Sequence, residues 1–214
     1  MQALMTNYGS ASARMTTLKL HSYILFYKPY RVLSQFTDDA GRRTLAEFGL
    51  PSGVYAAGRL DYDSEGLLLL TDDGRFKHQL LEPLHAHPRT YLVQIERVPQ
   101  QKDLEPLRKG VVIEGKKTKP ATVRMLESEP QLPPRDPPIR VRRDISTAWI
   151  ELTIAEGRNR QVRKMTAAIG YPTLRLIRIR IGEFALGALK PGEWKTAGNL
   201  GENNNPLLRN LFFP

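Results

Sequence analysis

The sequence contains no cysteine. Disulfide scaffolds, thiolate zinc sites and cysteine nucleophiles are therefore excluded, and the composition fits a reducing compartment. The chain also lacks an apolar run close to the roughly 20 residues that span a bilayer. Residues 1–19 lack the continuous apolar region of a secretory signal. These absences predict a cytoplasmic protein with no membrane partner.

Histidine is scarce, and its distribution does not suggest a metal site. The four histidines are His21, His78, His85 and His87. They are scattered without the spacing of a ligand set, and His85 with His87 alone is weak support for metal binding. We therefore expect no metal and no cofactor.

Acidic residues are outnumbered, with 22 Asp and Glu against 32 Lys and Arg, so the formal net charge is +10. This excess favours a polyanionic partner over a basic surface that is merely solvated. Between Arg135 and Arg180 we count eleven Lys or Arg against four Asp or Glu, a net charge of +7 in 46 residues. Most of the excess therefore lies in one segment.

One stretch, residues 58–71, places charged residues directly before four consecutive leucines. The leucines are followed by Thr71, two aspartates and Gly74, so the run is too short for an independent helix and predicts a strand buried on both faces. The acidic loop before it is therefore anchored. Within that loop Asp61 lies two residues from Arg59, which favours the ionised carboxylate and makes Asp61 a candidate reactive group.

Simpler interpretations of the loop remain open at this point. Asp61, Asp63 and Glu65 partly match a calcium loop, but Leu69 replaces a ligand position and no amphipathic helix pair flanks the match. Asp61 and Asp63 could be paired glycosidase carboxylates, although residues two apart on one loop rarely straddle a sugar ring. A plain turn is the default for the loop alone.

A second stretch, residues 157–165 with the sequence GRNRQVRKM, lies downstream. Together the two stretches resemble the pseudouridine synthases of the RsuA and RluA type, within the group of RsuA, RluB, RluE and RluF. The family carries a G-R-L-D loop, a G-L-L-L-L-T strand, a tyrosine in a K-x-Y context and a G-R-x-x-Q-V-R segment. Here these are residues 58–61, residues 66–71, Tyr91 and residues 157–163. The resemblance covers roughly residues 22 to 197.

The resemblance implies a role for each matching residue. Asp61 is the expected catalytic aspartate, Arg163 its salt-bridge partner, and Tyr91 the residue that stacks on the flipped base. Arg59 is expected to fill the gap that the flipped nucleotide leaves. The expected RNA-binding residues of the basic segment are Arg140, Arg142, Arg143, Arg158, Arg160 and Lys164. The implied reaction isomerises a uridine of large-subunit ribosomal RNA and needs no cofactor.

The implied fold is α+β, a mixed and mostly antiparallel sheet with flanking helices and a central catalytic cleft. Residues 22–197 would form this domain as two fused subdomains, between a mobile tail at 1–21 and a second tail at 198–214. Two departures from the family appear. Arg89 stands where the family often has lysine before its tyrosine, and the residues before Ser22 leave no room for an S4 RNA-binding domain.

Periodicity predicts strands at residues 22–27, 32–36, 54–57, 67–71, 90–95, 111–113, 121–126, 147–154 and 174–181. Helices are predicted at 44–48, 76–82, 103–109 and 159–169. We expect Lys28 to face solvent, and the arginines of 174–181 to form either a basic stripe or a solvated face. The partner is expected to be ribosomal RNA or an assembly intermediate, bound by a monomer. The rivals are a catalytically silent RNA-binding or ribosome-assembly protein, and a hydrolase that uses Asp61 and Asp63.

Overall fold

The computed structural model describes residues 21–82, 87–139 and 145–197. The expected tails at 1–21 and 198–214 therefore lie outside the described residues, apart from His21. Arg140, Arg142 and Arg143 lie outside them as well. Among the described residues, no helix is long and apolar enough to cross a membrane.

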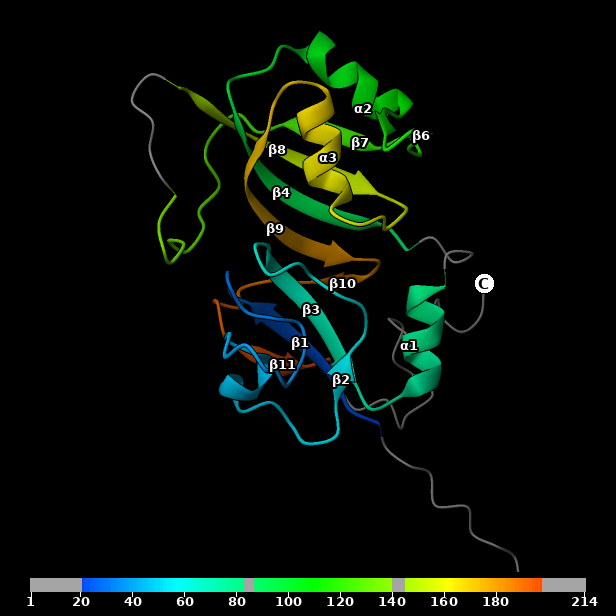
Figure 1. Ribbon diagram of the computed structural model, residues 1–214, viewed down its shortest axis with the longest axis vertical. Helices are drawn as coiled ribbons and strands as arrows, with labels where there is room; N and C mark the ends of the chain where they lie inside the picture. Colours follow the sequence, from blue (N-terminus) through cyan, green and yellow to red (C-terminus); the bar gives the residue numbers. More distant parts are fainter. Residues whose placement is uncertain (1–20, 83–86, 140–144, 198–214) are drawn as a thin grey trace, which may run out of the picture.

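A nine-stranded sheet runs through the described residues in the order β11-β1-β3-β9-β4-β8-β7, with β2 paired to β3 and β10 paired to β9 (Figure 1). Its strands are β1 (Tyr23–Lys28), β2 (Tyr55–Ala56), β3 (Glu65–Thr71), β4 (Arg89–Glu96), β7 (Thr122–Met125), β8 (Thr147–Ile154), β9 (Thr173–Ile181), β10 (Phe184–Ala185) and β11 (Trp194–Thr196). A small hairpin joins β5 (Val112–Ile113) to β6 (Lys116–Lys117). The helices are α1 (Gly74–Leu81), α2 (Glu105–Lys109) and α3 (Gln161–Ala168), with 3-10 turns η1 (Leu45–Phe48) and η3 (Gln101–Leu104).

One strand pair divides the sheet into two halves. β3 and β9 are parallel, with Glu65 opposite Ile177 and Gly66 opposite Arg178, whereas the other described pairs are antiparallel. In Figure 1, β1, β2, β3 and β11 form the lower half, and β4, β7, β8 and β9 the upper half. The expectation of a mixed, mostly antiparallel α+β fold is confirmed.

Gly66 makes this junction possible. Its φ is +102°, and a Cβ atom there would lie 2.3 Å from the carbonyl oxygen of Arg178. Glycine is the residue that tolerates both the positive φ and such a close approach of two backbones. The glycine before the leucines therefore lets β3 pair with β9.

Strand β3 is buried over its whole length, as the leucine run predicts. Its apolar side chains pack into clusters on both faces of the sheet. In the upper half, Leu107 of α2 and Val162 and Met165 of α3 join the core over β4 and β8. Each fully buried side chain of this size contributes roughly 1.5–3 kcal/mol. Ala168, at helical spacing from Met165 on α3, is exposed.

The predicted strand at residues 32–36 is wrong. The segment is irregular, and its backbone hydrogen bonds connect it to the chain just before η1, from Leu33 N to the Arg43 carbonyl and from Leu45 N to the Gln35 carbonyl. Arg31 has a positive φ of 57° and turns the chain away from β1. The apolar residues at 32–36 reflect the burial of Val32 in the core rather than pairing with a neighbouring strand.

The expectation that Lys28 faces solvent is also wrong, because its side chain is 0% exposed at the end of β1. Nζ donates to the carbonyls of Pro29, at 2.9 Å, and Val32, at 2.7 Å. The turn after Pro29 folds these carbonyls over the ammonium group. Burial lowers the pKa of Lys28 to about 7, against the opposing charge of Glu65.

We predict that Lys28 makes the free energy of unfolding rise with pH. Below about pH 7, Lys28 is protonated in both the folded and the unfolded state. Between about pH 7 and 10.5, Lys28 binds a proton more strongly in the unfolded chain than in the folded protein, so the free energy of unfolding increases by up to about 1.4 kcal/mol per pH unit. Urea unfolding of wild type and Lys28→Met from pH 7 to 9.5 isolates this contribution as a difference. Lys190→Met, at an exposed lysine, should follow the wild type. Parallel curves for wild type and Lys28→Met would contradict the prediction.

Candidate active site

A cleft of about 460 Å³ opens where the two halves of the sheet meet. Its walls come from the loop before β3, the end of α1, strands β4 and β9, and the segment that leads into α3. The lining residues are Ala57, Gly58, Arg59, Leu60, Asp61, Ser64, Leu80, Leu81, Arg89, Tyr91, Ile154, Gly157, Arg158, Asn159, Arg160, Gln161, Val162, Leu176, Arg178 and Ile181. Both sequence motifs therefore reach one cleft, although about 100 residues separate them.

Asp61 lies on this cleft in a loop that is held at several points. The Ser34 hydroxyl donates to the Leu60 carbonyl at 2.8 Å and accepts from Leu60 N at 3.1 Å. Ser64 N donates to the Asp61 carbonyl at 3.0 Å, which closes a turn directly before β3. The Asp61 side chain is 37% exposed. The loop is thus rigid, with a carboxylate that a ligand can reach.

Asp63 is the carboxylate that the arginines bind most closely. Arg160 Nη1 and Nη2 donate to its two oxygens at 2.8 and 2.7 Å. Arg163 Nη2 donates to the Asp63 carbonyl at 2.6 Å, and Arg163 Nε lies 3.4 Å from Oδ2. Burial alone would raise the pKa of Asp63, but the hydrogen bonds of Arg160 and the charge of Arg163 outweigh it and lower the pKa. Asp63 stays ionised.

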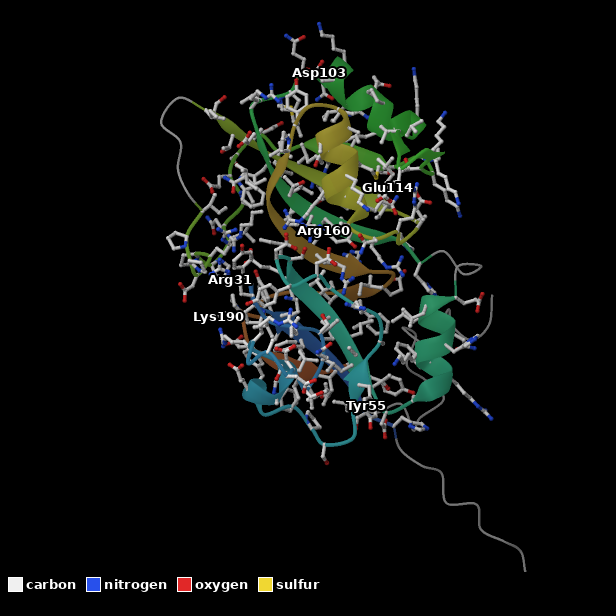
Figure 2. All side chains as sticks on the ribbon, viewed as in Figure 1. Arg31, Tyr55, Asp103, Glu114, Arg160 and Lys190 are labelled. Carbon is white, nitrogen blue, oxygen red and sulfur yellow. The ribbon has the colours of Figure 1, made fainter. Side chains whose placement is uncertain are left out.

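The ion pair expected between Arg163 and Asp61 is not made in this structure. Arg163 is instead bound to Asp63 and donates to the Thr173 carbonyl at 3.3 Å. Arg160 Nη1 comes to 3.9 Å from Asp61 Oδ2. Figure 2 shows Arg160 at the boundary between the two halves of the sheet. In this structure both Arg160 and Arg163 therefore contact Asp63, and the role of Arg163 as the partner of Asp61 stays a prediction.

Tyr91 lines the cleft from β4, where it is 7% exposed. Arg178 on β9 and Leu152 on β8 lie opposite it across the two neighbouring strands. The position of Tyr91 in the middle of three strands fixes its ring. The Tyr91 side chain is therefore both packed in the sheet and part of the cleft wall.

The expected RNA-binding residues divide into two described groups. Arg59, Arg158 and Arg160 line the cleft, whereas Lys164 does not and pairs with Glu114 at 2.6 Å. Arg158 donates to the carbonyls of Lys116, at 3.1 Å, and Ile113, at 2.8 Å, and so fixes the β5–β6 hairpin beside the cleft.

The cleft residues that were not predicted as site residues include Arg89, Asn159 and Arg178. Arg89 was noted only as a departure from the family, and Arg178 only as part of an alternating strand. No local pattern distinguishes a cleft-facing arginine from its neighbours on the same strand. The junction of β3 with β9 brings Arg178 to the cleft, and that pairing is not visible in the sequence.

The geometry also bears on the alternatives for this loop. Two guanidinium groups occupy Asp63, so that carboxylate is unsuited to calcium. Asp63 is also absent from the cleft lining, so it does not face Asp61 across a substrate. Within the described part of the chain, no group of three or more histidines and carboxylates could hold a metal ion. Asp61 is the single carboxylate among the described residues that line the cleft, beside Tyr91 and several arginines.

Comparisons with known proteins agree with this arrangement. Residues 22–168 match the family model described as RNA pseudouridylate synthase. The chain is 61% identical over 170 residues to ribosomal large subunit pseudouridine synthase E of Xanthomonas axonopodis pv. citri, covering 78% of this chain and 90% of that relative. It is 52% identical over 178 residues to the protein of the same name from Vibrio parahaemolyticus, covering 83% and 74%.

A crystal structure of a pseudouridylate synthase has the same fold, with a TM-score of 0.69 and 29% identity, over 83% of this chain and 70% of that one. The family match includes the loop of Asp61, Tyr91 and the whole of α3. On the sequence match, the identities and the shared fold, the chain belongs to the RNA pseudouridylate synthase family.

Proposed function

We propose that the protein isomerises a uridine of large-subunit ribosomal RNA to pseudouridine, with Asp61 as the catalytic group. The proposal rests chiefly on one observation, the accessible Asp61 carboxylate in a cleft that also contains Tyr91. The names of the relatives from Xanthomonas and Vibrio support the substrate class. The substrate is naked ribosomal RNA or an assembly intermediate.

The reaction breaks the bond from ribose C1′ to uracil N1, turns the base and joins C1′ to C5. Asp61 either adds to the sugar or removes a proton from it, and Tyr91 stacks on the flipped uracil. Arg59, which is exposed at the cleft, fills the gap in the RNA stack, for which a planar guanidinium is suited. The Asp63 carboxylate positions Arg160 and Arg163 around the loop. No step requires a metal or a redox cofactor.

We propose that the protein acts as a monomer. We also propose residues 22–197 as the catalytic domain, built from two fused halves that meet at β3 and β9. A catalytically silent RNA-binding protein would not need Asp61, Tyr91 and the arginines in one cleft. A hydrolase would need a second carboxylate facing Asp61, and Asp63 is held away by Arg160.

The test is to map pseudouridine across ribosomal RNA from cells with and without the gene, and to restore it with purified protein. We expect one or a few large-subunit uridines to lose modification and to regain it with wild type. Unchanged maps, with RNA binding retained by the purified protein, would favour the silent RNA-binding alternative.

We propose that Arg140, Arg142 and Arg143 bind phosphates around the target. If about five phosphates are contacted, log affinity should fall against log salt with a slope of about 3 to 4. The triple alanine variant should lower this slope by up to about 2, while the rate on saturating RNA changes little. Filter binding at salt concentrations from roughly 50 to 300 mM, where phosphate contacts dominate the affinity, measures this slope. An unchanged slope in a folded variant would place the RNA footprint elsewhere.

A further inference from the structure

Arg178 is a buried cation that the proposed reaction has not yet used. It is 4% exposed in the middle of β9 and lines the cleft. Nε donates to the Leu67 carbonyl at 2.8 Å and Nη1 to the Arg59 carbonyl at 3.4 Å, while Nη2 is buried and makes no hydrogen bond. Among the described residues no carboxylate forms an ion pair with it.

Arg175, three residues earlier on the same strand, is the instructive comparison. It is also buried, but Glu65 neutralises it through two hydrogen bonds of 2.8 Å. A buried guanidinium without an acidic partner is costly, because desolvation is not repaid by an opposite charge. Burial lowers the pKa of Arg178, against the opposing effect of the adjacent Tyr91 hydroxyl, yet arginine remains protonated in proteins.

The fold places this uncompensated charge beside the expected position of the base. Arg178 and Tyr91 are opposite one another in the register of β9 and β4, and Tyr91 is the residue proposed to stack on uracil. The Leu67 and Arg59 carbonyls hold the guanidinium between the start of β3 and the loop of Asp61. In a low-dielectric cleft, a fixed charge of this kind acts strongly on charge that develops nearby.

We infer that Arg178 stabilises the negative charge that develops on the uracil ring when the C1′–N1 bond breaks. The electron pair of that bond passes to the uracil and is shared among N1, O2 and O4. The sugar, which is now electron-deficient, either forms a C1′–O bond with the Asp61 carboxylate or loses a proton to it. After the base turns, an electron pair at C5 forms the bond to C1′ as the C1′–O bond to Asp61 breaks, or as the Asp61 carboxyl returns its proton to the sugar; C5 then loses a proton and N1 gains one. The inference rests on the proposed function and deepens it.

The test compares leaving groups in Arg178→Gln. Fluorine withdraws electrons, so 5-fluorouracil carries negative charge more easily than uracil and needs less stabilisation from the protein. Single-turnover rates are measured with RNA containing uridine or 5-fluorouridine at the target, following loss of the original nucleoside.

We expect the single-turnover rate of the variant to fall about 100-fold with uridine, the size typical of one removed electrostatic donor. With 5-fluorouridine it should lose about 10-fold or less, and RNA affinity should be nearly unchanged.

Two further variants make the result decisive. Arg124→Gln removes a positive charge from an exposed position on β7 and should keep both rates. Arg178→Lys keeps the charge without the planar fork, so it should fall between wild type and Arg178→Gln with the same dependence on the substrate. If urea unfolding shows that Arg178→Gln is not folded, the two substrates are compared with Arg178→Lys instead.

Equal losses on the two substrates, or a loss that appears only as weaker RNA binding, would assign Arg178 a structural or binding role and overturn the inference. So would an Arg178→Gln variant as active as Arg124→Gln. Each of these outcomes requires an active wild type. An inactive wild type on both substrates would overturn the proposed function itself.

Discussion

Asp61→Asn is expected to abolish pseudouridine formation, a loss on the order of 10³-fold or more, while RNA affinity stays within a few-fold of wild type. The carboxylate has to form a bond or accept a proton during the reaction, and an amide of the same size can do neither. The RNA is a polyanion, so one carboxylate contributes little to attraction. Because Asp61 is 37% exposed and its loop is fixed through backbone and Ser34 contacts, the substitution should leave the fold intact. Single-turnover kinetics and filter binding on the same RNA measure the two quantities.

Asp63→Asn is the matched control, two residues away on the same loop. It should keep substantial activity, since Asp63 does not line the cleft. Some loss is expected, because the substitution weakens the two hydrogen bonds from Arg160 and leaves Arg163 with the carbonyl of residue 63. If both variants were equally inactive, a single catalytic aspartate would be the wrong assignment, and the paired-carboxylate interpretation would return.

Features set by neighbouring residues could be predicted from the sequence. Four leucines between an acidic loop and Asp72 predict a buried strand, and β3 is buried throughout. Thr44 and Glu47 form a capping box at η1, where the sequence predicts a helix at 44–48. Gly170, with φ of +87°, follows the end of α3, as a helix stop should. These outcomes depend on local backbone preferences and on the period of apolar residues.

Partners across the fold could not be predicted in the same way. Arg175, Arg178 and Arg180 alternate along one strand, yet the first two are buried and only Arg180 is exposed. What separates them is the short parallel pairing of β3 with β9, which also brings Glu65 to Arg175. Lys28 is likewise buried because of a turn that follows it. The sequence does not show which carboxylate each arginine binds, and only the folded geometry does.

The buried pair of Glu65 and Arg175 is the second place where a single change should have a large effect. Glu65 is 2% exposed and Arg175 is 6% exposed. Besides its two bonds to Glu65, Arg175 Nη2 donates to the Pro133 carbonyl at 2.9 Å, which ties the segment before β8 to the junction of the sheet. Burial and then the charge of Glu65 raise the pKa of the neighbouring Tyr27 to about 12, so Tyr27 stays neutral at pH 7 and cannot replace a lost charged partner.

Glu65→Leu and Arg175→Met should each lower the free energy of unfolding by about 3–5 kcal/mol, because each leaves a buried charge without its partner. The double variant leaves no buried charge at this site, and it should be more stable than the sum of the two losses predicts by about 2–3 kcal/mol. Urea unfolding at pH 7 of wild type, both single variants and the double variant gives this coupling energy. The exposed pair of Arg124 and Glu151, at 2.8 Å, is the matched control. Its coupling should stay below about 1 kcal/mol, because water screens both charges. Additive losses at Glu65 and Arg175 would show that the two side chains act through packing alone and that the junction of β3 with β9 does not depend on their charges.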